Sequence, residues 1–449
     1  AHDQLLHRRV DLLLRTGKLL VESLADTNRI VRNMKRTAAY LGIPEEKLHI
    51  NVSYTMLMVN VSDGDYSFTK FQRIETHGVN MTAISEVSKL SWRAIEEDYS
   101  LDRYEEELEK IRTKKRNYTP WQVAIGAGFA CGGFCIQFGC DWMAFLYASI
   151  AAIIGMRVRA KCNESGLNHY MGIAIAAFVS TILAWASTLL PAEWTTTPWH
   201  PLLACALFIV PGVPLINFVD DMLDNYIQVG IVRAVNTLLM VAAMAFGIVF
   251  AVKLCHIADF FPTISMVPHH AYWEYAIAAA ISAMGFSMIF NIQRRLLWVV
   301  AIGGIIAVCT RNFVNLGAST DNIGLDMGLV IGSFSGSVLV SLIAVKAVHW
   351  FHVPNHVLTI PSVIPMIPGV LMYRMLFGII NINVQSIDQV TPLMKAIESG
   401  VNSGLVIMVI ALGVAIPNIF GRKYIASSKN KRLAELLKER KARGKFIEW

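Results

Sequence analysis

The sequence predicts a polytopic α-helical membrane protein with ten transmembrane helices, arranged as a 5+5 inverted repeat with two Pro/Gly-broken helices, and an N-terminal cytoplasmic α+β domain. Three observations lead to this prediction. Hydrophobic residues fill 54% of the 449 positions and charged residues only 16%, whereas soluble domains average roughly 25% charged residues. From residue 120 onward, apolar segments near the roughly 20 residues that cross a bilayer follow one another. Two of them, residues 202–233 and 356–377, contain similar Pro-Gly interruptions.

The N-terminal α+β domain is expected over residues 1–118, long enough to form its own core. The spacing of its leucines predicts an initial amphipathic helix, and period-two alternation around Asp63-Gly64 predicts a hairpin followed by two more helices. The expected elements are residues 3–41 (helix), 49–61 and 66–74 (strands), 81–97 and 101–115 (helices).

The ten expected membrane segments form two halves of five, residues 119–258 and 259–421. The expected spans are residues 120–139, 142–158, 169–190, 201–219 and 230–254, then 272–291, 296–310, 325–348, 357–380 and 401–420. Lys and Arg are concentrated in the connections that lie inside if the N-terminus is inside, so both termini are expected in the cytoplasm. Because each half has an odd number of spans, the second half would insert upside down relative to the first.

The C-terminal segment, residues 422–449, is strongly basic. It holds ten Lys and Arg against three Glu, and its net charge of +7 equals the formal charge of the whole chain. Leu433, Leu436 and Leu437 lie on one stripe of an expected helix, so the segment predicts a basic amphipathic tail bound to anionic lipids of the inner leaflet. It could equally pack on the N-terminal domain. Because the excess charge is confined to this tail, nucleic acid is not an expected partner.

The seven cysteines lie in or beside apolar segments. Cys131, Cys135 and Cys140 are close in sequence, but no histidine clusters with them and their spacing fits no zinc motif. We therefore interpret them as small residues for helix packing. The sequence predicts no metal and no cofactor.

The two interruptions are the expected solute site. Val210-Pro211-Gly212-Val213 and Ile367-Pro368-Gly369-Val370 are near-copies, and paired interruptions in corresponding halves mark the binding sites of transporters. A half-helix N-terminus offers amide hydrogens to a carboxylate, and unwound carbonyls can accept from an ammonium group. The expected substrate-binding residues are Pro211, Gly212, Val213, Pro214, Asn217, Pro365, Pro368, Gly369, Tyr373 and Arg374. The alternative is that the prolines only kink packed helices and that Arg374 anchors its helix near the headgroups.

Three carboxylates are candidates for carrying a proton. Asp221 follows the first interruption and would suit coupling or gating if it lies in a cavity at bilayer depth. Asp326 and Glu274 are the other acids at the edges of the membrane segments. The alternative is a solvated loop or interfacial position for each of them.

These residues resemble the threonine/serine exporter family. The resemblance rests on residues 13–23 with Thr27, on His77-Gly78-Val79-Asn80-Met81, on residues 211–217 with Asp221, Gly230 and Arg233, and on residues 360–369 with Tyr373-Arg374. It covers nearly the whole chain, with both halves fused in one polypeptide. The resemblance implies a bacterial inner-membrane secondary transporter that exports small hydroxylated amino acids and uses the proton gradient.

Two alternatives stay open beside this interpretation. Relatives split into two polypeptides look like dicarboxylate exporters, so a succinate-like substrate is the first. The second is a membrane-anchored hydrolase or sensor acting through the N-terminal domain, although His77 there has no nucleophile motif such as G-x-S-x-G near it. The sequence favours a transporter rather than an enzyme, with a small molecule and protons as its partners, and is compatible with a homo-oligomer.

Overall fold

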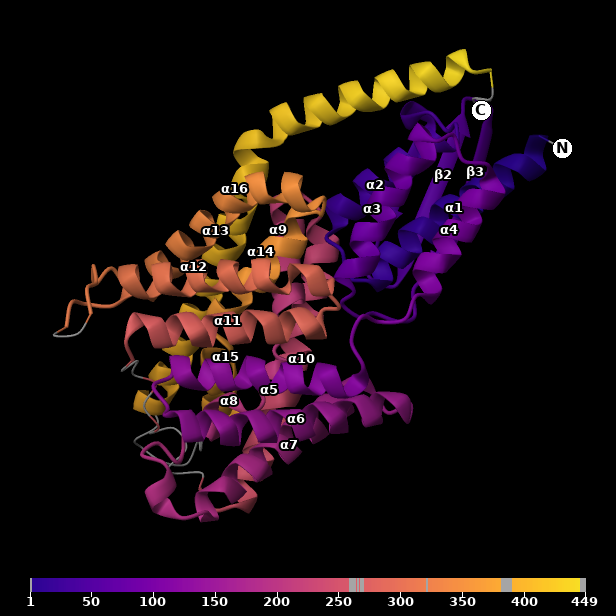
Figure 1. Cartoon of the computed structure of the whole chain (residues 1–449). Helices are drawn as coiled ribbons and strands as arrows, with labels where there is room; N and C mark the ends of the chain where they lie inside the picture. Colours follow the sequence, from indigo (N-terminus) through magenta and orange to yellow (C-terminus); the bar gives the residue numbers. More distant parts are fainter. Residues whose placement is uncertain are drawn as a thin grey trace. The chain divides into compact units, whose positions relative to one another are not determined.

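The computed structural model describes residues 2–257, 264, 266, 270–319, 322–380 and 390–444. The chain forms two compact units (Figure 1). The N-terminal unit contains Ala1–Arg116, Asn217–Arg233 and Pro417–Trp449, and the membrane unit contains Asn117–Ile216 and Ala234–Ile416. Of the four boundaries between the units, one follows Arg116 and the other three fall inside helices: α9 (Gly212–Leu223), α10 (Ile227–Leu254) and α16 (Val390–Ala442).

The N-terminal unit combines four helices of the N-terminal segment with a three-stranded antiparallel sheet of order β1-β2-β3. Its elements are α1 (His2–Glu22), α2 (Thr27–Tyr40), β1 (Leu48–Val52), β2 (Met56–Asp63), β3 (Tyr66–Arg73), α3 (Met81–Glu96) and α4 (Leu101–Thr113). In β2, Leu57, Val59 and Val61 alternate with exposed or half-buried positions and are fully buried. Because α1 packs on β2 and β3, this apolar face of the sheet is the core of the unit.

The hairpin expected at Asp63-Gly64 is confirmed: β2 ends at Asp63, β3 begins at Tyr66, and the two residues pair. Gly64 has a φ of +59°, which is the left-handed conformation that glycine adopts at little cost. The two helices expected after the sheet are confirmed as α3 and α4.

The single helix expected over residues 3–41 is wrong, because the chain turns between α1 and α2. Leu24 adopts a φ of +60°, and the Ala25 amide donates to the Leu20 carbonyl, as at a helix C-terminus. Asp26 then caps α2, its carboxylate accepting from the Arg29 amide at 3.2 Å. A helix end is recognised in a sequence by a glycine at this left-handed position, and here a leucine occupies it. The sequence therefore carried no signal that α1 ends.

The single strand expected over residues 49–61 is also wrong. A tight turn divides it into β1 and β2, with the Ser53 amide donating to the Met56 carbonyl at 2.9 Å. The sheet therefore has three strands rather than two, and Ile50 of β1 pairs with Val59 of β2. The uninterrupted alternation had concealed the turn because no glycine or proline marks it.

The membrane unit is helical. Its first elements are α5 (Pro120–Gln137), α6 (Trp142–Glu164), α7 (His169–Ala186), α8 (Pro201–Ala204) and the 3₁₀ turn η4 (Leu207–Ile209), followed by the start of α9 and the part of α10 from Ala234 onward. The next elements are α11 (Tyr272–Ile289), α12 (Leu297–Asn315), α13 (Leu329–Phe351), α14 (Asn355–Val363), the 3₁₀ turn η7 (Ile364–Met366), α15 (Gly369–Ile380) and the part of α16 up to Ile416. Within this unit α5 packs on α6 and on α11, α6 on α7, α11 on α12, and α12 on α13 (Figure 1).

Within the described residues, six helices are long and apolar enough to cross a membrane, and two bent pairs raise this number to eight. The bent pairs are Pro201–Ile209 with Gly212–Leu223, at 59°, and Asn355–Met366 with Gly369–Ile380, at 53°. The other two expected spans correspond to α5 and α11, which are 18 residues long. Small and polar residues lower their hydropathy, as in the Gly-rich sequence of α5.

Helices α5 and α11 approach each other through glycines. A Cβ placed on Gly285 would lie 2.2 Å from the Gly126 carbonyl oxygen, so only glycine fits there. Ser282 of α11 also donates to the Ala130 carbonyl of α5 at 2.9 Å. Close backbone approach at small residues, with a hydroxyl bonded across the helices, is how membrane helices associate without a hydrophobic driving force.

Candidate functional site

The first interruption separates η4 from α9. Val210 is extended, with φ −53° and ψ 121°, because a residue that precedes proline is disfavoured in the helical region. The Gly212 amide donates to the Val210 carbonyl at 2.9 Å, and the Leu215 amide donates to the Pro211 carbonyl at 3.0 Å. The helix therefore stops at Val210 and restarts at Gly212, as the sequence predicts.

The second interruption, between η7 and α15, has the same geometry. Ile367 is extended, with φ −61° and ψ 130°. The Gly369 amide donates to the Ile367 carbonyl at 2.9 Å, and the Met372 amide to the Pro368 carbonyl at 3.2 Å. Pro365 lies inside η7. The near-identical sequences of the two interruptions thus form near-identical backbone structures.

The two interruptions contact each other inside the membrane unit. A Cβ on Gly212 would lie 2.3 Å from Ile364 Cδ1, and a Cβ on Gly369 would lie 2.8 Å from Leu207 Cδ2. Each glycine of one interruption therefore lies against the 3₁₀ turn of the other. Because a larger residue would separate these segments, the glycines permit the close approach.

A small cavity of about 10 Å³ lies between the two interruptions. Its lining consists of four corresponding pairs, one member from each half: Phe134 with Phe286, Leu207 with Ile364, Val210 with Ile367, and Gly212 with Gly369. The Phe134 and Phe286 rings meet edge to face at 5.8 Å. The cavity has room for about one water molecule and is lined almost entirely by apolar groups.

The first turns of α9 and α15 begin at this cavity. The amide hydrogens of a first helical turn have no partner inside the helix, and the helix dipole makes this end positive. Val213 and Val370 occupy the first turns, and Pro214 has no amide hydrogen to offer. The polar groups available at the interruptions therefore belong to the backbone.

Three of the expected site residues have partners elsewhere. Tyr373 donates its hydroxyl to the Leu203 carbonyl at 2.8 Å, and both residues are buried. Arg374 Nη2 donates to the Ile264 carbonyl at 2.8 Å. Asn217 Nδ2 donates to the Leu24 carbonyl at 2.8 Å inside the N-terminal unit. None of the three belongs to the lining of the small cavity.

A second polar cluster lies in the N-terminal unit around Asp221. Its Oδ2 lies 3.0 Å from Arg233 Nη1, and its two oxygens accept from the Thr27 amide and the Thr27 hydroxyl, each at 2.9 Å. Arg233 Nη2 also donates to the Ala25 carbonyl at 2.8 Å. The residues after the first interruption thus hold the turn between α1 and α2.

This cluster joins residues that the sequence had placed in separate motifs. Thr27, Asp221 and Arg233 all belong to the segments that carry the family resemblance, and they meet in the fold. The sequence prediction named Asp221 but missed Thr27 and Arg233 as its partners. All three residues lie in segments that carry the family resemblance, and this was the signal in the sequence that could have connected them.

The other two candidate proton carriers occupy different environments. Glu274 Oε2 accepts from the Ala271 amide at 3.1 Å and lies 2.9 Å from His270 Nδ1, at the start of α11. Asp326 is exposed, with a φ of +55°, in the loop before α13. The span expected from residue 325 starts instead at Leu329, so Asp326 lies outside the helix. Among the interactions of the described residues, Glu274 and Asp326 have no contact with each other.

Comparison with known proteins gives two family matches and a set of partial relatives. Residues 11–255 match the family described as "Putative threonine/serine exporter", and residues 275–420 match "Threonine/Serine exporter, ThrE". Among curated proteins, the "Probable succinate transporter subunit YjjP" of Klebsiella aerogenes is 26% identical over 243 residues, which are 54% of this chain and 92% of that protein. The protein of the same name from Escherichia coli K12 is also 26% identical over 243 residues, which cover 93% of it. No solved structure matches the chain.

Proposed function

Because the chain belongs to the threonine/serine exporter family, we propose that it is a secondary active transporter that exports threonine and serine. The observation that carries this proposal is the contact between two Pro-Gly interruptions across a cavity lined by corresponding residues. The solute binds there, with its carboxylate toward the first turns of α9 or α15 and its ammonium group toward unwound carbonyls.

Solute binding requires the two interruptions to separate. Ligand pockets usually enclose roughly 300–1,000 Å³, and the cavity encloses about 10 Å³. Movement of η4 with α9 against η7 with α15 enlarges it, because the contacts at Gly212 and Gly369 are with apolar side chains and apolar packing is non-directional. Alternating access then consists of opening this contact first on one side and then on the other.

We propose that the membrane part is a ten-helix 5+5 inverted repeat. The packing partners correspond between halves: α5, α6 and α7 all contact α8, and α11, α12 and α13 all contact α14. Likewise, η4 contacts α5 and η7 contacts α11. In this arrangement α5 and α11 are the first spans of their halves. They lie between other helices of the unit, which reduces their need for lipid-facing apolar residues.

The proposed domains keep the limits expected from the sequence: residues 1–118 as a cytoplasmic domain, 119–258 and 259–421 as the two halves, and 422–449 as a basic cytoplasmic tail. Both termini then face the cytoplasm at the inner membrane of a bacterium. The distribution of Lys and Arg supports this orientation. The boundary at residue 258 lies outside the described residues.

Proton entry supplies the energy for export. One charge moving through 100 mV provides about 2.3 kcal/mol, which sustains roughly a fortyfold solute gradient. Of the three candidate carboxylates, Asp221 is the one that is buried and held on α9. This position supports Asp221 as the first to test, ahead of Glu274 and the exposed Asp326.

Export of a succinate-like dicarboxylate is the second candidate function. It is supported by the partial relatives, which are named as probable succinate transporter subunits and match 54% of the chain. Those relatives are described as subunits, whereas this chain carries matches to both family models in one polypeptide. A dicarboxylate would place a second carboxylate where threonine has its ammonium group.

Counterflow in proteoliposomes distinguishes these candidates. Labelled threonine, serine and succinate are offered side by side to vesicles loaded with each unlabelled solute, with and without a proton gradient. We expect threonine and serine exchange that falls in Gly212→Ala, where the new methyl group meets Ile364, loses its dependence on the proton gradient in Asp221→Asn, and is retained in Gly404→Ala, a change in α16 with open space around it. Exchange of succinate alone would contradict threonine and serine as the substrates. Absence of exchange for all three solutes would overturn the transport proposal.

A further inference from the structure

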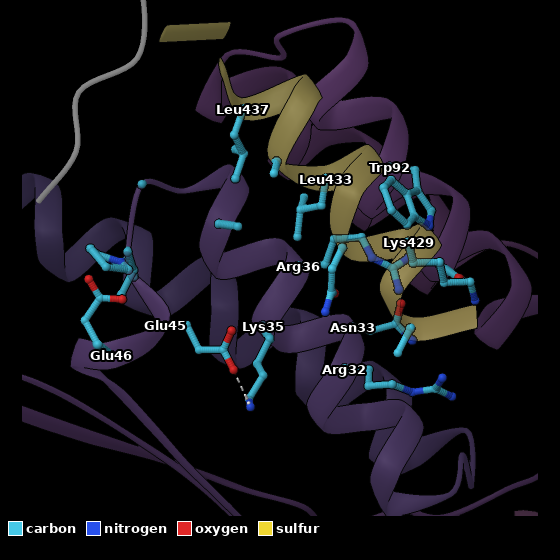
Figure 2. A pocket seen from close by; sticks show the side chains of 18 of the residues that line it. Arg32, Asn33, Lys35, Arg36, Glu45, Glu46, Trp92, Lys429, Leu433 and Leu437 are labelled. Atoms are coloured by element: carbon cyan, nitrogen blue, oxygen red, sulfur yellow. Dashed lines mark hydrogen bonds and ion pairs between the residues drawn. The ribbon is translucent and has the colours of Figure 1, made fainter. Parts of the chain in front are cut away.

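The N-terminal unit contains a large basic cavity, unrelated to the interruptions. It encloses about 770 Å³ and is formed by α2, the segment after it, α3 and the C-terminal part of α16 (Figure 2). Seven Lys and Arg line it, against two Glu. A volume of this size is typical of sites for small organic ligands.

Helical spacing brings these cations together. Arg29, Arg32 and Arg36 lie three and four residues apart and so share one face of α2. On α16, Lys429 shares a face with Leu433 and Leu437, and all three line the cavity. Figure 2 shows Arg36 and Lys429 near Trp92, with Leu433 and Leu437 further along the same helix. The cavity thus combines a cationic part with an apolar wall.

Some of these charges are neutralised locally. Lys35 Nζ lies 2.7 Å from Glu45 Oε1 (Figure 2), and Arg29 Nε lies 3.4 Å from Asp26 Oδ1. In contrast, among the described residues Arg36 and Lys429 have no carboxylate within ion-pair distance. The Arg36 guanidinium lies 4.3 Å from the centre of the Trp92 ring, and its buried Nη1 has no hydrogen-bond partner in the described part of the chain.

The tail is held in place by ion pairs outside this cationic part. Arg440 Nε lies 2.5 Å from Asp98 Oδ1, and Arg432 pairs with Glu96. These pairs keep Lys429 near Arg29, Arg32 and Arg36 although the four charges repel one another. Burial and this repulsion lower the pKa of Lys429 to about 8 and that of Arg36 to about 9. Arg36 and Lys429 are partly buried beside these like charges and have no carboxylate of their own within ion-pair distance in the described part of the chain. Such an arrangement is costly, and a bound anion would relieve this cost.

We propose that this cavity binds an organic phosphate, either a free phosphate ester such as a nucleotide or the headgroup of an anionic phospholipid. A phosphate carries up to two charges on one compact group and accepts the forked donors of arginine in pairs. Arg36 and Lys429 contact the phosphate, and the wall of Ile43, Leu433 and Leu437 contacts the organic part. The ligand links α2 to the tail of α16 and so regulates the chain from the N-terminal unit.

Calorimetric titration of the purified full-length protein in neutral detergent tests this site. The probes are ATP, inorganic pyrophosphate, short-chain phosphatidylglycerol and, as a phosphate-free dianion, succinate. We expect binding of a phosphate probe that weakens with added salt. Lys429→Gln and Arg36→Gln should each weaken it by about tenfold or more, as expected for loss of a charged hydrogen bond.

Arg73→Gln is the matched control, because Arg73 is exposed on β3 and does not line the cavity, and it should bind as wild type. Lys429 is only partly covered by the cavity and keeps contact with solvent, so Lys429→Gln tests the site even if Arg36→Gln impairs folding. Binding of ATP or pyrophosphate assigns a soluble ligand, and binding of phosphatidylglycerol alone assigns a lipid. Succinate binding of equal strength that Lys429→Gln also weakens, equal loss in Arg73→Gln, or no binding of any phosphate probe would overturn the proposal.

Discussion

Asp221 and Arg233 form an ion pair in which the two side chains are only 1% and 3% exposed. The pair makes further hydrogen bonds to Thr27 and to the Ala25 carbonyl. These bonds join Thr27 to Asp221, which lie 194 positions apart in the chain, and Ala25 to Arg233, which lie 208 positions apart. A carboxylate that the sequence presented as a candidate for proton coupling is therefore also a structural link within the N-terminal unit.

Breaking this pair should destabilise the protein strongly. Removal of one partner of a buried ion pair leaves an uncompensated charge and costs about 3–5 kcal/mol, so Asp221→Asn should lower the thermal midpoint of the purified protein. Asp221→Asn combined with Arg233→Met should recover part of the loss. The matched control is Glu97→Gln, which breaks the half-exposed pair with Arg103 and should cost less than about 1 kcal/mol. Equal midpoints for Asp221→Asn and Glu97→Gln would contradict the structural role.

Enlarging Gly212 should block transport through crowding at the interruption. In Gly212→Ala the new methyl group meets Ile364, and overpacking typically costs 1–3 kcal/mol, equivalent to a factor of about 5 to 150 in an equilibrium. We expect counterflow to fall by that factor, because the contact between interruptions must close fully in the transport cycle. The second change Ile364→Ala should restore exchange by making room.

The corresponding pair in the other half offers an independent check. Gly369→Ala should fail in the same way and be rescued in part by Leu207→Ala, since a Cβ on Gly369 would lie 2.8 Å from Leu207 Cδ2 and 2.9 Å from Val210 Cγ2. Gly404→Ala, with nothing near its new methyl group, should transport normally. Gly212→Ala with normal exchange, or with a defect that Ile364→Ala does not relieve, would mean that the contact is not part of the cycle.

The sequence predicted the interruptions well because their cause is local. Proline and glycine fix the backbone at Val210-Pro211-Gly212 and Ile367-Pro368-Gly369 whatever surrounds them. A solute site between them was expected, but the phenylalanines that line the cavity were not predicted. Phe134 and Phe286 lie on helices without any interruption, and only three-dimensional packing brings them to the cavity. Alignment of the two halves position by position was the signal that could have found these pairs.

The polar partners were harder to predict for a different reason. Asn217, Tyr373 and Arg374 are polar residues close to an interruption, and this suggested contact with a solute. In the structure each donates to a backbone carbonyl, because a buried donor is costly without an acceptor. Sequence proximity could not reveal those acceptors, which lie between 110 and 193 positions away.

Loss of the Tyr373 hydroxyl should destabilise the membrane unit measurably. Its hydrogen bond to the Leu203 carbonyl joins α15 to α8 in a fully buried position. Tyr373→Phe leaves that carbonyl without this donor and should cost about 1–3 kcal/mol, seen as a lower thermal midpoint in detergent. Tyr66→Phe is the control, since its hydroxyl bonds Asp3 on the surface and should change stability by less than about 0.5 kcal/mol. Equal effects of the two changes on the thermal midpoint would show that the buried hydrogen bond does not stabilise the membrane unit.

Acidification should destabilise the N-terminal unit through His77. Its Nε2 lies 2.7 Å from the Tyr54 carbonyl and its ring stacks on the Tyr54 ring at 3.9 Å. Burial lowers the pKa of His77 below its ordinary value, with the charge of Arg233 acting in the same direction. The unfolded chain therefore binds a proton at a higher pH than the folded chain, and stability falls as the pH drops through about 6.5.

His77→Gln tests this pH dependence, because glutamine can donate to the Tyr54 carbonyl but does not titrate. Thermal midpoints of the full-length protein measured from pH 8 to pH 5 should decline less steeply in the variant than in wild type. The two curves should run parallel above about pH 7, where the histidine is neutral in both the folded and the unfolded states. Parallel curves over the whole range would show that His77 makes no contribution to acid sensitivity. A steeper decline in His77→Gln would mean that protonation of this ring stabilises the fold instead.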